Sequence, residues 1–115
     1  MIAFAVLLAD TSPTRSYSSV DSLGSDISRH GLGCPRLYPA GLLNPDDEAA
    51  NCVTGSATVT IHVLHDPSLM DRLDDPTPRS GVSWARGPNW LVATMDRTAA
   101  ARVALALNGD LIPGP

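Results

Sequence analysis

The sequence contains no lysine, few aromatic residues and few charged residues. All eight basic residues other than histidine are arginines, and they occur singly between Arg15 and Arg102. A protein that binds nucleic acid usually gathers its basic side chains on one face, because those side chains neutralise phosphates. The scattered arginines and the net charge of −4 therefore argue against a nucleic-acid partner.

The chain also lacks an apolar run of the about 20 residues that a membrane-spanning helix requires. Residues 1–9, MIAFAVLLA, form a shorter run with the length of the apolar part of a secretory signal peptide, about 7–15 residues. No basic residue precedes it, so we interpret residues 1–16 as the remnant of a signal peptide or membrane anchor, followed by a polar tether. This predicts an exported protein, extracellular or associated with the cell envelope, with its N-terminus near a membrane. The alternative is an N-terminal strand packed on the single domain of residues 17–115.

Cysteine is scarce, because only Cys34 and Cys52 are present and no C-x-x-C motif occurs. The absence of that motif argues against thioredoxin-like redox chemistry and against a cysteine zinc cluster. In an exported protein an even number of cysteines favours a disulfide, and closing a loop of this size stabilises a fold by about 3 kcal/mol. We therefore predict a Cys34–Cys52 disulfide. The alternative is a pair of reduced, buried cysteines in a cytosolic interaction domain.

Motifs of several common enzyme classes are missing as well. The sequence contains no G-x-S-x-G nucleophile elbow, no phosphate-binding loop and no dinucleotide fingerprint. Serine, histidine and aspartate are all present, but a catalytic triad is established by geometry and not by composition. We therefore assign no catalytic and no cofactor-binding residue and expect no cofactor, with a small hydrolase as the alternative function.

His62 and His65 are the only closely spaced histidines, and Asp66 follows them. His62 belongs to a predicted strand, and residues an odd number apart on a strand point to opposite faces. We therefore interpret both histidines as surface residues and predict no metal site.

The clearest structural signal is the stretch TVTIHVLHDPSLMDRL, residues 58–73. Every second residue from Val59 to Val63 is β-branched and apolar, which is typical of a strand with one buried face. Asp66 can cap a helix, and Pro67 fits the first helical position, where its missing N–H is not needed. We therefore predict a strand followed directly by a short helix that runs from Asp66 to the end of the stretch.

Spacing and turn residues predict the remaining elements. A helix is expected within residues 17–33, with Ser18 near its start and Gly31 at its end. The following residues up to 51 are expected to be irregular, with a solvated acidic run at 46–48. A short strand at residues 51–54 then forms a hairpin through Gly55 and Ser56.

A second hairpin is expected from strands at residues 82–86 and 90–95. The helix after it is capped by Asp96 or Thr98 and has an apolar stripe, and a short strand at 111–112 closes the domain. The stripe consists of Ala100, Val103, Ala104 and Leu107.

The two hairpins and the helices after them share a pattern when the chain is shifted by 32 residues. Gly55 then coincides with Gly87, and the apolar series from Val59 coincides with Leu91, Ala93 and Met95. The pattern predicts the order α-ββ-α-ββ-α in an α+β two-layer sandwich, with an antiparallel sheet and the helices on one face. A small, partly closed barrel is the alternative.

The run GPNWLVATMDRTAAARVALALNGDLI combines a Gly-Pro-x-Trp strand with an Ala-rich helix that ends in Asn-Gly. This run resembles the C-terminal part of small, uncharacterised secreted or lipid-anchored proteins of actinobacteria. The two cysteines ahead of the first hairpin are similar as well, and the resemblance covers about residues 17–112. It implies a location outside the cytosol and carries over no activity.

The predicted pattern also places a partner surface on the second hairpin. If Leu91 and its series face the helices, Trp90 and Val92 form an exposed apolar patch on the opposite face, and such patches mark interfaces. Trp84 and Arg86 lie close by, and aromatic residues and arginine are favoured at binding hot spots. We therefore predict an exported or membrane-associated binding module whose partner is another protein or a second copy. The alternative is that both indoles fill the core.

Overall fold

The computed structural model describes residues 15–40, 47–66 and 81–112. All neighbouring strands of its sheet are antiparallel, in the order β1-β2-β3-β5-β4-β6. This confirms the predicted α+β class with an antiparallel sheet. Apart from Asp66 itself, the helix predicted to start at that residue lies outside the described residues. The described elements are α2 (Val20–Arg29), β1 (Tyr38–Pro39), β2 (Asp47–Thr54), β3 (Ala57–Leu64), β4 (Ser83–Arg86), β5 (Trp90–Thr94), α4 (Arg97–Ala106) and β6 (Asp110–Ile112).

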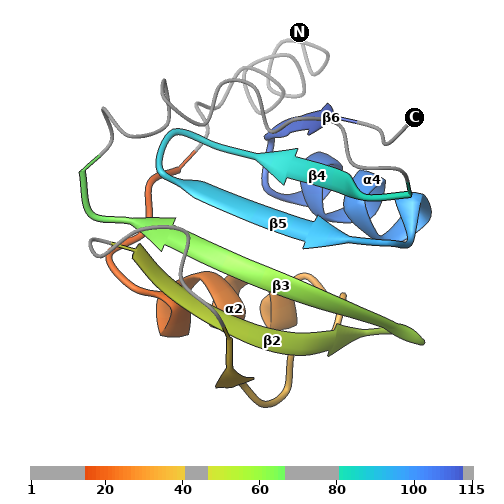
Figure 1. The fold of residues 1–115 in the computed structure, drawn as a ribbon, viewed down its shortest axis with the longest axis horizontal. Helices are drawn as coiled ribbons and strands as arrows, with labels where there is room; N and C mark the ends of the chain where they lie inside the picture. The colour runs from red at the N-terminus through yellow and green to blue at the C-terminus, as the bar shows by residue number, and fades with distance from the viewer. Residues whose placement is uncertain (1–14, 41–46, 67–80, 113–115) are drawn as a thin grey trace, which may run out of the picture.

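Both described helices cover the same face of the sheet, as predicted (Figure 1). Helix α2 packs on β2 and β3, and α4 packs on β4 and β5. One buried apolar cluster lies between the two layers and includes Leu23, Ile27, Val59, Ile61, Trp90, Val92 and Val103. The sheet is open and ends in β1 and β6, which rules out the partly closed barrel for the described strands.

Helix α2 begins with a capping box one residue after the predicted position. The hydroxyl of Ser19 accepts a hydrogen bond from the Ser22 amide, and the Ser22 hydroxyl accepts one from the Ser19 amide. Two amide groups that the helix leaves without partners are thereby satisfied. The helix ends at Arg29, and His30 is its C-cap. The next residue is Gly31, whose φ of 74° is a conformation that glycine adopts without strain.

Helix α4 is capped by Asp96, as predicted. Its Oδ1 atom accepts hydrogen bonds from the amides of Thr98, at 2.9 Å, and Ala99, at 3.2 Å. The predicted apolar stripe is buried against the sheet, including the helix residues Ala100, Val103 and Ala104. Neither α4 nor α2 has the length and apolarity of a membrane-crossing helix.

The first hairpin has the predicted buried face but a longer first strand. Val59, Ile61 and Val63 of β3 are all buried in the core, as predicted. Strand β2 begins at Asp47 and not at Asn51. It pairs with β3 along the whole length of both strands. The end of the acidic run is therefore part of the sheet, not of a solvated loop.

The second hairpin faces the opposite way from the prediction. Strand β5 pairs with β3 in a register that sets Trp90 against Val63 and Val92 against Ile61. Directly paired residues share one face of a sheet, so Trp90 and Val92 point at the helices, and each is 0% exposed. Met95, predicted to be in the core, is 71% exposed. The predicted core positions were displaced by one residue, which exchanges the two faces of a strand.

The error arises because the two turns begin on opposite faces of the sheet. In the first hairpin only Gly55 and Ser56 lie between the last paired positions. In the second hairpin residues 87–90 lie between the last paired positions. This difference of two residues does not by itself change the face of a strand residue. Gly55, however, follows a residue on the helix-covered face, whereas Gly87 follows a residue on the opposite face, so matching the two glycines misplaces every later side chain.

Trp90 fills the end of the core beside the second turn. A Cβ atom on Gly87 would lie 2.0 Å from the Trp90 Nε1 atom, and one on Gly109 would lie 2.7 Å from the indole ring. Nε1 donates a hydrogen bond to the Arg15 carbonyl at 3.0 Å. The ring also meets the ring of Tyr17 edge-on, with 6.2 Å between centroids. The alternative that this indole fills the core is therefore correct.

Candidate ligand-binding cleft

Cys34 and Cys52 form a disulfide, as predicted. Cys34 lies in the loop after α2 and Cys52 lies in β2, and both residues are buried. The bond therefore ties the loop after α2 to the strand that leads into the first hairpin turn.

This loop lies directly against the end of β2. A Cβ atom on Gly33, whose φ is 115°, would lie 2.4 Å from the Val53 carbonyl oxygen, so a larger residue does not fit there. The Cys34 amide donates a hydrogen bond to the same carbonyl at 2.7 Å. Disulfide, hydrogen bond and close packing together fix the loop beside the hairpin turn.

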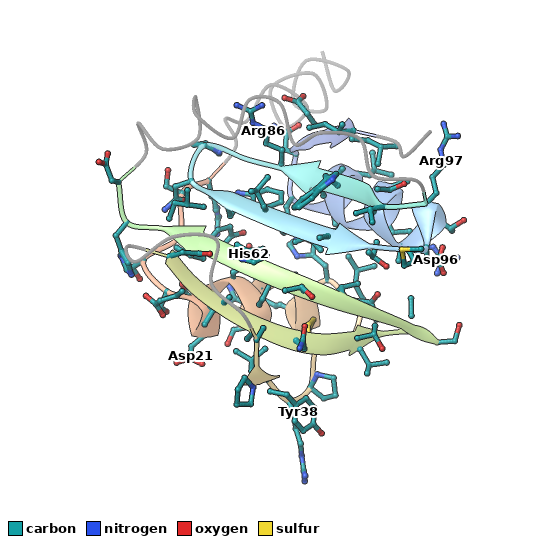
Figure 2. All side chains as sticks on the ribbon, viewed as in Figure 1. Asp21, Tyr38, His62, Arg86, Asp96 and Arg97 are labelled. Atoms are coloured by element: carbon teal, nitrogen blue, oxygen red, sulfur yellow. A yellow bond between two sulfur atoms is a disulfide. The ribbon has the colours of Figure 1, made fainter. Side chains whose placement is uncertain are left out.

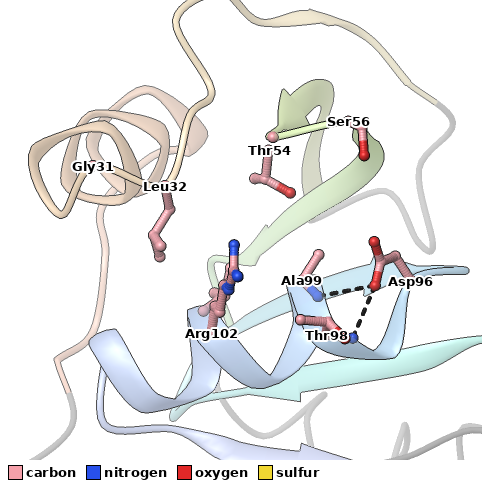
Figure 3. A pocket seen from close by; sticks show the side chains of 10 residues that line it. Gly31, Leu32, Thr54, Ser56, Asp96, Thr98, Ala99 and Arg102 are labelled. Carbon is pink, nitrogen blue, oxygen red and sulfur yellow. Dashed lines mark hydrogen bonds between the residues drawn. The ribbon is translucent and has the colours of Figure 1, made fainter.

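A cleft of about 150 Å³ opens where this loop, the first hairpin turn and the start of α4 meet (Figure 3). Its walls are residues 31–32 of the loop, residues 54–56 at the turn, and Asp96, Ala99 and Arg102 on the side of α4. A volume of this size holds about five water molecules or one molecule of the size of benzene. The cleft therefore suits a molecule smaller than a typical drug-sized ligand.

The α4 wall of the cleft has its helix amides already satisfied. Both hydrogen bonds accepted by the Asp96 carboxylate go to its Oδ1 atom, from Thr98 and Ala99 (Figure 3). The amides at the start of α4 are therefore not available to an anion. The Asp96 carboxylate itself is exposed at this edge of the cleft.

Two polar side chains at the cleft lack partners in the described part of the chain. Thr54 is 7% exposed, and its hydroxyl oxygen is buried without a hydrogen-bond partner there. A buried polar group left unsatisfied costs about 1–3 kcal/mol. Arg102 is exposed and extends into the cleft (Figure 3). Its guanidinium group forms no ion pair with a carboxylate of the described residues.

The predicted partner surface is not assembled as expected. Trp90 and Val92 are core residues, so the prediction that they contact a partner is wrong. Trp84 and Arg86 do lie on the face away from the helices and are half-buried. Trp84 packs there on the buried pair Leu64 and Leu91. A partner contact through Trp84 and Arg86 stays a prediction.

His62 is not a surface residue, contrary to the prediction. It is 4% exposed, and its Nδ1 atom lies 3.0 Å from Oδ2 of the buried Asp47. The register of β2 and β3 explains the pairing, because both residues lie on the face away from the helices. His65 pairs separately with Glu48 near the surface. The described residues contain no cluster of three groups that could hold a metal ion.

Tyr17 forms a second buried polar pair at the far side of α2. Its hydroxyl group donates a short hydrogen bond to Oδ2 of Asp26, and both residues are buried. Burial of the hydroxyl group raises the pKa of Tyr17 above its ordinary value, and the hydrogen bond to Asp26 raises it further. The pair joins the start of the described chain to α2 and has a structural role.

The sequence predicts the disulfide beside the cleft, but it does not indicate Thr54 or Arg102 as site residues. Thr54 ends β2 directly before the Gly55 turn, where a threonine is an ordinary strand residue. Arg102 lies at an exposed position of α4, as Arg97 does. Neither position carries a local signal, because only the packing of α4 against the hairpin brings them together.

Comparisons with protein-family models, with curated proteins and with solved structures found no match to this chain.

Proposed function

We propose that this chain is a small exported binding domain, extracellular or associated with the cell envelope, that holds a small polar ligand in the cleft beside its disulfide. One observation carries the proposal. The loop that the disulfide holds in place borders a cleft that is also lined by Thr54 and Arg102. The buried hydroxyl of Thr54 and the guanidinium group of Arg102 both lack partners among the described residues. Native proteins leave few buried polar groups unsatisfied, and those few deserve a functional explanation.

Two further observations support export. Structural disulfides persist mainly in oxidising compartments, and the Cys34–Cys52 bond is buried within the fold. The apolar run at residues 1–9 has the length of a signal-peptide segment. The resemblance to secreted or lipid-anchored actinobacterial proteins points the same way.

Export can be tested by expressing the full chain with a C-terminal tag in an actinobacterial host. Free thiols are blocked before lysis, and cytosol, envelope and medium are then separated. The proposal predicts a chain in the envelope or the medium with no free thiol. A cytosolic chain with both cysteines free contradicts it.

Binding can be tested by recording amide spectra of the ¹⁵N-labelled, oxidised protein with mixtures of small polar metabolites. The mixtures contain amino acids, hydroxy acids, sugars and amines. The proposal predicts saturable shifts that include the amides of Gly31, Gly55 and Ala99, which line the cleft. If no mixture shifts these amides at millimolar concentration, the cleft is not a small-molecule site.

A small hydrolase is the second candidate, and the buried His62–Asp47 pair favours it. A carboxylate that orients a histidine is two-thirds of a catalytic triad. Within the described residues, however, no hydroxyl group is hydrogen-bonded to His62, and the hydroxyl of Thr60, two residues away, donates to Asn51 at 2.6 Å. Hydrolysis of activated esters that His62→Gln abolishes without loss of folding would favour this candidate over the binding domain.

A further inference from the structure

We propose that the ligand of the cleft is a small zwitterion, a free α-amino acid, whose carboxylate binds Arg102 and whose ammonium group binds Asp96. This inference rests on the proposed binding function and adds the charge pattern of the ligand. It follows from three groups that surround one small space, Arg102, Asp96 and Thr54.

Arg102 supplies the positive side of the cleft. Its guanidinium group points into the space between the hairpin turn and α4 (Figure 3), and no carboxylate of the described residues neutralises it. A guanidinium group offers paired N–H donors that match the two oxygens of a carboxylate. The ligand group that best matches this side is therefore a carboxylate.

Asp96 supplies the negative side. Its Oδ1 atom is occupied by two helix amides, whereas its Oδ2 atom accepts no hydrogen bond from a described group. A ligand with negative charge alone is repelled by Asp96, and a ligand with positive charge alone is repelled by Arg102. A zwitterion meets an opposite charge at both sides.

Thr54 supplies a neutral polar group between the charges. Its hydroxyl can donate and accept, and its oxygen is buried beside the cleft without a partner in the described chain. A space of about 150 Å³ holds a molecule of about six non-hydrogen atoms, which is the size of the smallest free amino acids.

The test is calorimetric titration of the oxidised full chain with three matched probes. L-serine carries both charges, 3-hydroxypropionate lacks the ammonium group, and ethanolamine lacks the carboxylate. We expect saturable binding of L-serine and at least roughly tenfold weaker binding of the other two. Equal affinity for L-serine and either of the other probes would overturn the proposal that the ligand is a zwitterion.

Matched variants locate the site. Arg102→Gln removes the charge from the cleft, and Arg97→Gln removes the same charge from the same helix, where Arg97 extends away from the sheet (Figure 2). Asp96→Asn keeps a good helix cap while removing its charge. We expect Arg102→Gln and Asp96→Asn each to weaken L-serine binding by roughly tenfold and Arg97→Gln to leave it unchanged. Equal losses in both arginine variants would place the ligand elsewhere.

Failure of this inference and failure of the proposed function give different results. If neither L-serine nor any other amino acid of the mixtures binds but another metabolite shifts the cleft amides, the proposal of a zwitterionic ligand is wrong and the binding function stands. If neither the probes nor the mixtures act on the cleft, both are wrong.

Discussion

The two hairpin turns lie at opposite ends of the sheet and are built in opposite ways (Figure 1). At the end with residues 87–89, which we call the filled end, the indole of Trp90 fills the space beside the turn. A Cβ on Gly87 would collide with the indole of Trp90. At the end with Gly55 and Ser56, the open end, a Cβ on Gly55 would meet no atom within 4 Å.

The two ends also differ in how their polar groups are satisfied. At the filled end the Asn89 side chain bonds the backbone of Tyr17 in both directions, at 3.0 and 2.7 Å, and the Trp90 N–H donates to Arg15. At the open end the hydroxyl of Thr54 lacks a partner in the described chain. We infer that the filled end serves stability and the open end serves binding.

The largest effect on stability is expected at the filled end. Trp90→Ala removes a fully buried indole and should lower the free energy of unfolding by about 3–5 kcal/mol. Urea unfolding followed by circular dichroism measures the loss. A change below about 1 kcal/mol is typical of surface residues. Such a result would show that Trp90 is not a core residue and that the two ends of the sheet do not differ as described.

The disulfide is expected to have the next largest effect. Replacing Cys34 and Cys52 together by alanine opens a loop with a sequence separation of 18 and should cost about 3 kcal/mol. Because the same bond holds one wall of the cleft, the variant should also bind the cleft ligand less tightly. Unchanged binding by a folded double variant would show that the disulfide does not shape the cleft.

Tyr17→Phe tests the buried pair next to the filled end. It removes the hydroxyl that Asp26 accepts from and should cost about 1–3 kcal/mol, because the carboxyl stays buried. The raised pKa of Tyr17 means that the folded state holds this proton more tightly than the unfolded state. Its contribution is therefore complete below about pH 10, the usual pKa of tyrosine, and is lost as the pH rises further. The alkaline loss of stability should be smaller in Tyr17→Phe; an identical loss in both proteins would exclude Tyr17 as its source.

The smallest effect on stability is expected at the open end. Thr54→Val replaces a hydroxyl without a described partner by a methyl group and should leave stability unchanged or raise it by about 1 kcal/mol. Thr94→Val is the matched control, because Thr94 is equally buried but bonds the Thr58 carbonyl and the Asp96 amide. That control should lose about 1–3 kcal/mol. Similar losses in both variants would mean that the Thr54 hydroxyl is bonded after all.

Much of the fold could be predicted from local patterns. The alternation in β3, the Asp96 cap and the stripe of α4 each depend on neighbours within a few residues, and each is confirmed. The faces of the second hairpin could not be predicted by analogy with the first, because the two turns begin on opposite faces of the sheet. Matching the two glycines displaced the predicted core positions by one residue and placed Trp90 on the surface, although it lies in the core.

The candidate site was only partly predictable. The disulfide follows from an even cysteine count, but the cleft depends on how α4 packs beside a turn that is distant in sequence. His62 shows the same limit: its pairing with Asp47 required β2 to extend further than its apolar pattern indicates.

The most direct test of the comparison is a map of amide shifts during titration of the oxidised, ¹⁵N-labelled protein with L-serine. The glycines act as matched reporters, because Gly31 and Gly55 line the open end and Gly87 and Gly109 lie against Trp90 at the filled end. The account predicts saturable shifts at Gly31 and Gly55 and unchanged positions for Gly87 and Gly109. Shifts centred on Gly87 and Gly109, or no shifts at all, would contradict it.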